Sequence, residues 1–192
     1  PSASQLTFET LESFCRDCLL KTGVSDVHAG LAAKALTTAD AMGVFTHGSK
    51  LLTGYLRKLL AGGYRPQATP RVEREGKAWA IVDGESALGQ IGGIASMQLA
   101  IQKAKECGIA YVGLKNTGHI GAAGYYAILA AQSGIIGMVT GNDIPSVAAP
   151  GARKAVLGSN PLAYAVPVKN SDPILLDIAT AAVAGGKVYA AC

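Results

Sequence analysis

The chain has little charge, few cysteines and no apolar run long enough to cross a membrane. Charged residues make up only 16% of its 192 residues and hydrophobic ones 49%, so a sizeable core is expected and disorder is not. The apolar runs fall short of a membrane-spanning helix, and the polar N-terminus has no signal-peptide core. No membrane partner is therefore expected, and a cytoplasmic location is the default prediction.

Other protein classes are disfavoured in the same way. Four cysteines are too few for a disulfide framework in a chain of this size. Cys15 and Cys18 have redox spacing, but they lie in an amphipathic helical pattern, which favours two thiols packed on a helix face. The net charge of +4 is spread along the chain without a basic stripe, so no nucleic-acid partner is expected. Without H-x-x-x-H, H-E-x-x-H or a dense acidic cluster, no metal site is expected.

The periodicity of the chain changes near residue 65. Three helices are expected before it, capped or stopped near Thr7, Gly23, Ser25, Gly43 and Gly62. Strands are expected at 71–74, 78–82, 109–114, 135–140, 162–168 and 173–176, with helices at 89–107 and 125–132. This order predicts an α/β fold, with a helical region 1–65 followed by an α/β region 66–192. Because the chain starts without Met and stops where a helical pattern begins, we expect it to be processed or incomplete.

A glycine-rich stretch from Asn116 to Gly124 is the most informative local feature. An apolar run leads into it and a helical pattern leads out, so its backbone N–H groups and the helix dipole can hold a phosphate or carboxylate. Gly118, Gly121 and Gly124 are spaced G-x-x-G-x-x-G, unlike the G-x-G-x-x-G of a dinucleotide fold. A Rossmann-type cradle and a simple packing turn both remain open. His119, within the turn, adds a group that can carry a proton near neutral pH.

A second histidine, His47, lies in a short connector between two expected helices. Alone, it is typical of a solvent-exposed or cap-forming residue. Thr46 precedes it, and a neighbouring hydroxyl can relay a proton or orient the ring. His47 is therefore a candidate acid–base group.

Polar residues also follow the later strands. Asp143 ends one strand, about where a ribose-binding acid stands in a Rossmann fold. Asp177 ends another at a strand-to-helix turn, where it can cap the following helix or accept ribose hydroxyls. Ser159 and Asn160 lie in a turn by composition, and they can also grip a small polar substrate.

Taken together, these motifs resemble the malate/L-lactate dehydrogenase family that lacks a Rossmann fold, whose members include ureidoglycolate and sulfolactate dehydrogenases, diketogulonate reductase and piperideine-2-carboxylate reductase. The resemblance implies a non-Rossmann fold with an N-terminal helical layer and a mixed sheet, and it covers about the first half of a typical member. The matching segments are residues 39–43, 46–48, 83–84, 88–90, 116–127, 157–161, 177–180 and 184–187.

The resemblance also implies a reaction, a hydride transfer between NAD or NADP and a small 2-oxo acid or 2-hydroxy acid, by a homodimer. His47 corresponds to the proton donor and Thr46 to a hydroxyl that relays the proton; Lys187 and, in some members, His119 also belong to the catalytic set. The residues that correspond to cofactor contacts are His119, Ile120, Gly121, Ala122, Ala123, Asp143, Asp177, Ile178 and Ala179. We expect His119 mainly to hold the cofactor.

The substrate contacts are less defined. Ser159 matches a substrate-contacting hydroxyl, and Asn160 follows it. Many family members carry an Arg at the position of Leu51, well suited to bidentate carboxylate binding, so the substrate stays open and Lys50 is the candidate charge. Two alternatives are kept: a non-catalytic, incomplete piece of such an enzyme, and a Rossmann-type nucleotide-binding protein.

Overall fold

The computed structural model describes residues 6–182 and Lys187. These fall into two compact units, Pro1–Gly121 and Ala122–Cys192, each of which is described by itself. The predicted division near residue 65 separates helices from strands inside the first unit. As a domain boundary it remains a prediction.

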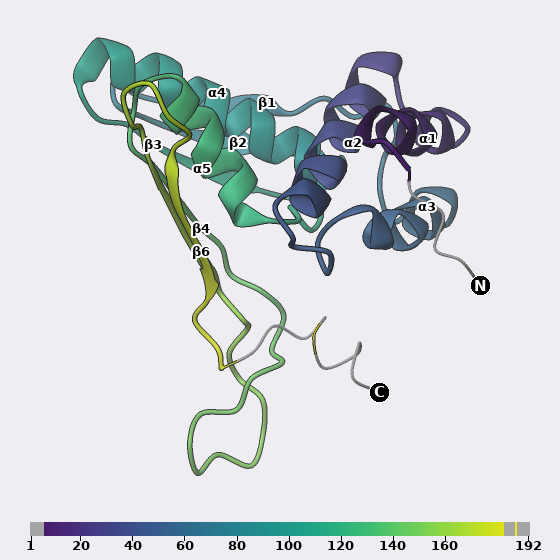
Figure 1. Cartoon of the computed structure of the whole chain (residues 1–192). Coiled ribbons are helices and arrows are strands. Elements are labelled where there is room, and N and C mark those ends of the chain that lie inside the picture. Colours follow the sequence, from purple (N-terminus) through teal and green to yellow (C-terminus); the bar gives the residue numbers. More distant parts are fainter. Residues whose placement is uncertain (1–5, 183–186, 188–192) are drawn as a thin grey trace. The chain divides into compact units, whose positions relative to one another are not determined.

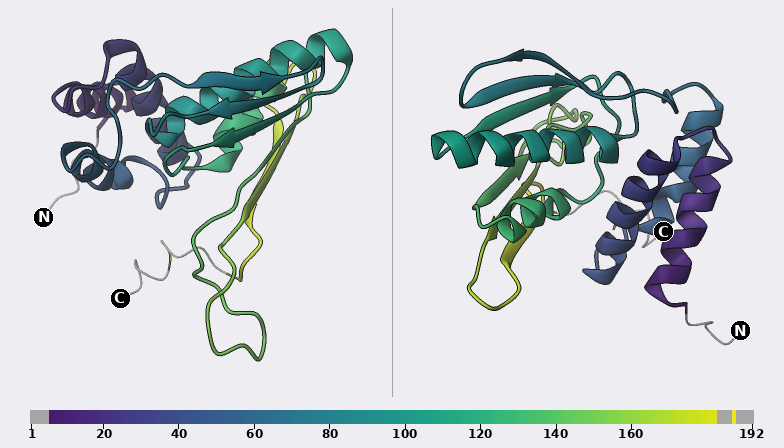
Figure 2. Two further views of the ribbon diagram at one scale, coloured as in Figure 1. Left: turned by 180° about the vertical axis from the view of Figure 1, so that it is seen from behind. Right: turned by 90° about the horizontal axis from the view of Figure 1, so that it is seen from above.

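The first unit begins with the expected helices α1 (Phe8–Leu20), α2 (Asp26–Ala41) and α3 (Leu52–Leu60), the last preceded by a 3-10 turn at Ser49–Leu51. Thr7 and Ser25 cap α1 and α2 through their side-chain oxygens, as predicted. α1 and α2 lie side by side (Figures 1 and 2). Cys15 is fully buried between them with a free thiol, and Cys18 packs at its edge, so the packing interpretation of this pair is confirmed.

A mixed three-stranded sheet completes this unit. Strand β1 (Arg71–Glu75) pairs antiparallel with β2 (Trp79–Asp83), and β2 pairs parallel with β3 (Tyr111–Lys115). The parallel pair requires a crossover, which α4 (Gly89–Cys107) provides. α4 packs along β2 and β3 (Figure 2) and ends at Gly108, whose φ of 82° is the left-handed conformation that glycine adopts without strain.

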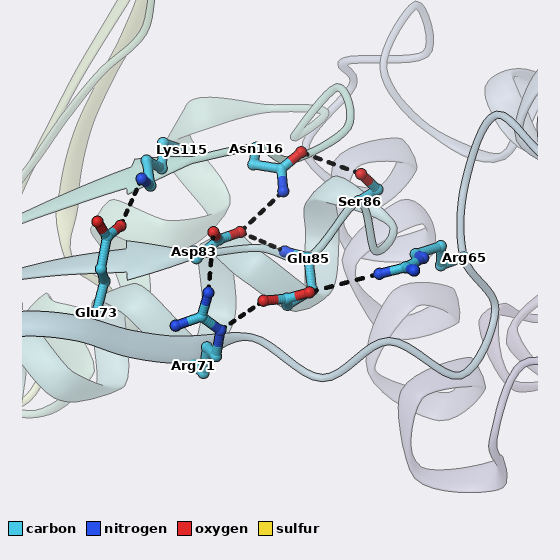
Figure 3. Close-up of polar contacts among 8 residues, drawn as sticks. All are labelled: Arg65, Arg71, Glu73, Asp83, Glu85, Ser86, Lys115 and Asn116. Atoms are coloured by element: carbon cyan, nitrogen blue, oxygen red, sulfur yellow. Dashed lines mark hydrogen bonds and ion pairs between the residues drawn. The ribbon is translucent and has the colours of Figure 1, made fainter.

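A polar network joins the ends of β2 and β3 and fixes where the glycine-rich turn begins (Figure 3). The Asp83 carboxylate accepts hydrogen bonds from Glu85 N at 2.8 Å and Asn116 Nδ2 at 3.0 Å. Ser86 donates its hydroxyl to Asn116 Oδ1 and its backbone N–H to Asn116 O. Glu85, Ser86 and Asn116 all have positive φ, a strained arrangement that these bonds hold in place.

This network predicts a pH-dependent contribution to stability. The pKa of Asp83 lies below its ordinary 3.8, first because Glu85 N–H donates to the carboxylate and then because the Asn116 amide does. Unfolding raises that pKa, so the contribution is complete above pH 3.8 and is lost as pH falls through the folded value. We expect Asp83→Asn to lower the free energy of unfolding at neutral pH, and the difference from wild type to shrink in acid. Urea titrations of both proteins at neutral and at acidic pH measure this difference in the free energy of unfolding. Asp172→Asn, on an exposed loop, should show no such trend.

The second unit packs one helix on an antiparallel sheet. Strands β4 (Gly137–Thr140), β5 (Pro161–Val166) and β6 (Ile174–Ala179) pair in that order, and α5 (Ala123–Gln132) covers one face. Ala163 and Ala165 are fully buried beneath the alanines of α5. Gly137 allows the close approach, since a Cβ there would lie 2.5 Å from the Ala127 carbonyl oxygen.

The described strands form two separate three-stranded sheets, neither of which has the parallel order of a dinucleotide-binding fold. The Rossmann-type alternative is therefore wrong for this part of the chain. The α/β class, with its helical N-terminal layer and a mixed sheet, is confirmed.

Candidate active site

The connector between α2 and α3 folds back tightly over the end of α2. Asp40 Oδ2 accepts a hydrogen bond from Ser49 N at 2.8 Å. The backbone at Gly48 passes so near this carboxyl that a Cβ would overlap it, at 1.9 Å from Oδ1. A side chain at this position would have to displace the Asp40 carboxyl from Ser49 N, so glycine suits the tight connector that carries the half-buried His47. Thr46 Oγ1 lies 2.9 Å from His47 Nδ1 and orients the ring.

The glycine-rich turn after β3 holds His119 equally closely. Gly118 N donates to Ala87 O, and a Cβ on Gly118 would lie 2.6 Å from the Tyr64 ring. A Cβ on Gly89, at the start of α4, would lie 2.3 Å from the carbonyl oxygen of His119. The turn is thus packed between α4 and Tyr64 with no room for side chains at these two glycines.

The two predicted histidines meet inside the first unit. The rings of His47 and His119 stack with centroids 5.6 Å apart and planes 25° from parallel. On its other side His119 contacts Tyr55 of α3, whose hydroxyl lies 2.8 Å from His119 Nδ1. Two imidazoles this close hold one positive charge more readily than two. The pair is suited to moving a proton.

Tyr55 is a site residue that the sequence did not indicate. It is 5% exposed, and burial raises the pKa of its hydroxyl well above the ordinary value, so the group stays protonated and can donate. In the sequence it is one apolar position of an amphipathic helix, which predicts core packing. Only the folded chain brings it to His119.

The second unit brings together three other predicted residues. Ser159 Oγ donates to Asp143 Oδ2 at 2.9 Å, and Asn160 Oδ1 accepts from Asp143 N at 3.2 Å. The antiparallel pairing of β4 with β5 places the end of one strand beside the start of the other, which explains the contact. Asp143 is exposed, so this cluster offers a carboxylate, a hydroxyl and an amide at the surface of the unit.

Asp177 corrects the sequence interpretation. We expected it at the end of a strand, capping the helix that follows; it lies inside β6 instead. Its Oδ2 accepts from Gly124 N at 2.8 Å, so it caps α5, whose own N-cap residue, Ala122, makes no side-chain bond. A carboxylate therefore already bonds to one N–H of the helix end that was predicted to cradle a phosphate. An anion there would meet like charge.

This cap should be measurable. Asp177→Ala removes the acceptor from the first turn of α5, and we expect it to lower the free energy of unfolding by about 1 kcal/mol. Asp177→Asn keeps an oxygen acceptor and should lose only the charge–dipole part, about 0.3–1 kcal/mol. Urea unfolding of both, beside Asp172→Ala, separates these contributions. Equal stability of the Asp177→Ala and Asp172→Ala proteins would contradict the capping role.

The remaining predicted residues occupy varied positions. Lys50 is exposed in the 3-10 turn, whereas the neighbouring Leu51 packs against the hydrophobic core. Ile178 lies on the opposite face of β6 from Asp177, 44% exposed. Lys187 is exposed, but its neighbours lie outside the described residues. Ile120 and Gly121 end the first unit, and the buried Ala122 and Ala123 begin the second.

Two further features are absent from residues 6–182 and Lys187, a membrane-spanning helix and a metal site. No helix there combines the length and apolarity needed to cross a membrane. No group of three or more His, Cys, Asp or Glu side chains is arranged to hold a metal ion in that same part of the chain.

The mixed sheet, the helical layer and the paired histidines define a class, α/β proteins with two histidines in contact and, in the part of the chain that the structure describes, no Rossmann sheet. Comparison with known proteins narrows this class: the chain belongs to the malate/L-lactate dehydrogenase family, whose sequence profile matches residues 6–192.

Its relatives include dehydrogenases of several hydroxy acids. The chain is 43% identical to a malate dehydrogenase of Pyrococcus horikoshii over 180 residues, covering 94% of this chain and 50% of that protein. It is 37% identical to an L-sulfolactate dehydrogenase of Methanocaldococcus jannaschii over 175 residues, covering 91% and 51%. The chain thus spans about half the length of the curated relatives it matches.

Solved structures of dehydrogenases and a reductase have a similar fold over this part of their chains. The structure of the Pyrococcus horikoshii malate dehydrogenase superposes with a TM-score of 0.93 at 42% identity, covering 96% of this chain and 53% of that one. A Δ1-piperideine-2-carboxylate reductase from Pseudomonas syringae superposes with a TM-score of 0.86 at 29% identity, covering 98% and 57%.

Proposed function

We propose that this protein is an oxidoreductase that transfers a hydride between NADH or NADPH and a small 2-oxo acid, giving the 2-hydroxy acid. The observation that carries the proposal is the stacked pair of His47 and His119, with Thr46 on one ring and Tyr55 on the other. Family membership supports it, because relatives are named as malate, sulfolactate and ureidoglycolate dehydrogenases. We further propose a cytoplasmic homodimer without nucleic-acid or membrane partners.

The catalytic roles follow from the chemistry of the pair. When bound, the nicotinamide supplies the hydride, and negative charge grows on the carbonyl oxygen of the substrate. His47 donates a proton to that oxygen and so lowers the barrier. The Thr46 hydroxyl on Nδ1 orients the ring and can pass its proton to Nδ1 as Nε2 gives one to the substrate, and solvent then restores the protons of Thr46 and of the ring. We keep Lys187 in the catalytic set on the strength of the resemblance alone.

The residues of the second unit suit the hydroxyl groups of a nucleotide better than its phosphates. Asp143 and Asp177 offer carboxylate oxygens, which accept bonds from ribose hydroxyls, and Asp177 would repel a phosphate at α5. We propose both as ribose contacts, with backbone and apolar contacts from residues 119–123, Ile178 and Ala179. Lys50, Ser159 and Asn160 are proposed for the substrate, with Lys50 as a point charge.

One assay tests the reaction. The protein is mixed with NADH or NADPH and a panel of 2-oxo acids and cyclic imino acids, and the absorbance of the reduced cofactor is followed. Cofactor affinity is measured separately by calorimetry. We expect oxidation with at least one substrate. If the cofactor binds and none of the substrates is turned over, the non-catalytic alternative replaces the proposal.

A further inference from the structure

Gln90 is a buried polar residue to which neither the motifs nor the proposed reaction assigns a role. It lies in the first turn of α4 and is 1% exposed. Neither Nε2 nor Oε1 of its side chain is within hydrogen-bonding geometry of a described residue. Burying an amide without partners is costly, and such groups in folded proteins commonly have a function that retains them.

The Gln90 amide lies next to the glycine-rich turn that carries His119. A Cβ built on Gly121 would be 3.5 Å from Gln90 Nε2, which places the amide next to that backbone. The amide is also near enough to the Tyr55 hydroxyl to lower its pKa, against the larger, opposite effect of burial. Gln90 therefore lies near both groups that bond to His119 Nδ1.

Those two bonds define which nitrogen of His119 carries the proton. Gly121 N donates to Nδ1 at 3.3 Å, and a backbone N–H can only donate. This long bond favours an acceptor at Nδ1 without fixing the tautomer by itself. With Nδ1 as the acceptor, Tyr55, 2.8 Å away, also donates to it, and the neutral ring has its proton on Nε2.

The direction of the hydrogen bond between Tyr55 and His119 determines which atom of the Gln90 amide can stabilise it. Once the Tyr55 hydrogen points at Nδ1, its oxygen has only lone pairs left to offer, and these call for a donor. The amide nitrogen of Gln90 is such a donor. The amide oxygen would instead draw the Tyr55 hydrogen toward itself and leave Nδ1 to Gly121 alone.

We propose that Gln90 is a positioning residue, whose Nε2 donates to Tyr55 Oη and keeps the Tyr55 hydrogen on His119 Nδ1. The chain Gln90–Tyr55–His119 then holds His119 as a neutral ring with Nε2–H, suited to donating a hydrogen bond to an oxygen of a bound ligand. This deepens the proposed function and rests on it, since a His119 held neutral leaves the proton transfer to His47.

The test is the tautomer of His119, measured by ¹⁵N–¹H NMR of the whole chain without substrate or cofactor. The chain has three histidines, so His28→Gln and His47→Gln assign the signals. Near pH ~8.5, where a histidine of ordinary pKa is neutral, we expect wild-type His119 to be the Nε2–H form. Gln90→Glu turns the donor into an acceptor of nearly the same shape and should shift the ring toward a mixture with Nδ1–H. Tyr55→Phe should do the same.

Ser96→Ala is the matched control. Ser96 is also buried on α4, its hydroxyl also lacks a partner among the described residues, and the substitution should leave the tautomer unchanged. A wild-type His119 in the Nδ1–H form overturns the proposal without any variant. So does a Gln90→Glu protein that folds by circular dichroism and keeps the wild-type tautomer. Because this measurement needs no turnover, its outcome is independent of the failure or success of the enzymatic assay.

Discussion

Replacing His47 by Gln is expected to lower kcat by a factor of about 10² to 10⁴, the usual worth of a positioned general acid. Glutamine fills similar space and can still donate a hydrogen bond, but it cannot give up a proton. The affinity for NADH or NADPH should change much less than kcat, because His47 is not itself a proposed cofactor contact, although its ring stacks on that of His119. Stopped-flow or steady-state absorbance gives kcat, and calorimetry gives the Kd of the cofactor.

The chain offers a matched control for this experiment. His28 is half-buried on α2 and has no proposed role, so His28→Gln should keep wild-type kcat. Thr46→Val removes only the hydroxyl 2.9 Å from His47 Nδ1 and should lower kcat by less than His47→Gln does. Should His119→Gln abolish turnover while His47→Gln spares it, the proton donor is His119 and the proposed roles are reversed.

The charge that we propose for substrate binding also lies in the connector that carries His47. Leu51, at the position where the family resemblance leads us to expect an Arg, is packed against the core and contributes no donor. Lys50 is exposed one residue earlier, on a different side of the 3-10 turn. An ammonium binds a carboxylate as a point charge without the two parallel bonds of a guanidinium. We therefore expect the protein to select the carboxylate of its substrate less strictly than it would with an Arg at position 51.

What could be predicted from the sequence was local. The N-caps at Thr7 and Ser25 and the end of α4 at Cys107 depend on residues within one turn of each helix, and all three are found where the patterns predict them. Most strand ends were predicted within two residues, as with β3, which begins at Tyr111 where the apolar run suggested Ile109; the end of β6 was missed by three, since it was expected at 176 and lies at Ala179. Local chemistry decides these features.

The parts that could not be predicted are contacts between distant residues. Asp177 was assigned to the helix after it, yet it caps α5, because pairing in the β4–β6 sheet carries it across to that helix. Tyr55 was expected to be a core residue because no pattern in its own helix indicates a contact with His119. A motif shows which residues are unusual, whereas topology decides which of them meet. The motifs identified His47 and His119 as candidates, and only the topology showed that they lie in contact.

The tight packing of α4 against the glycine-rich turn that carries His119 predicts a large effect of one substitution, Gly89→Ala, on stability. Gly89→Ala places a Cβ 2.3 Å from the His119 carbonyl oxygen and 2.4 Å from that of Gly118. Both are backbone atoms, so no side chain can rotate away, and either α4 or the turn must shift. We expect the free energy of unfolding to fall by about 1–3 kcal/mol, or roughly 2–4 °C in Tm for each kcal/mol.

The same substitution elsewhere separates this clash from the helix propensity of alanine. Gly30 lies inside α2, and a Cβ there would meet no atom within 4 Å. Gly30→Ala should therefore stabilise the protein by about 0.5–1 kcal/mol, because alanine loses less backbone entropy in a helix than glycine. Thermal unfolding of the two variants should give shifts of opposite sign. If Gly89→Ala is as stable as Gly30→Ala, α4 does not hold the turn, and the close packing cannot be what fixes His119 beside His47.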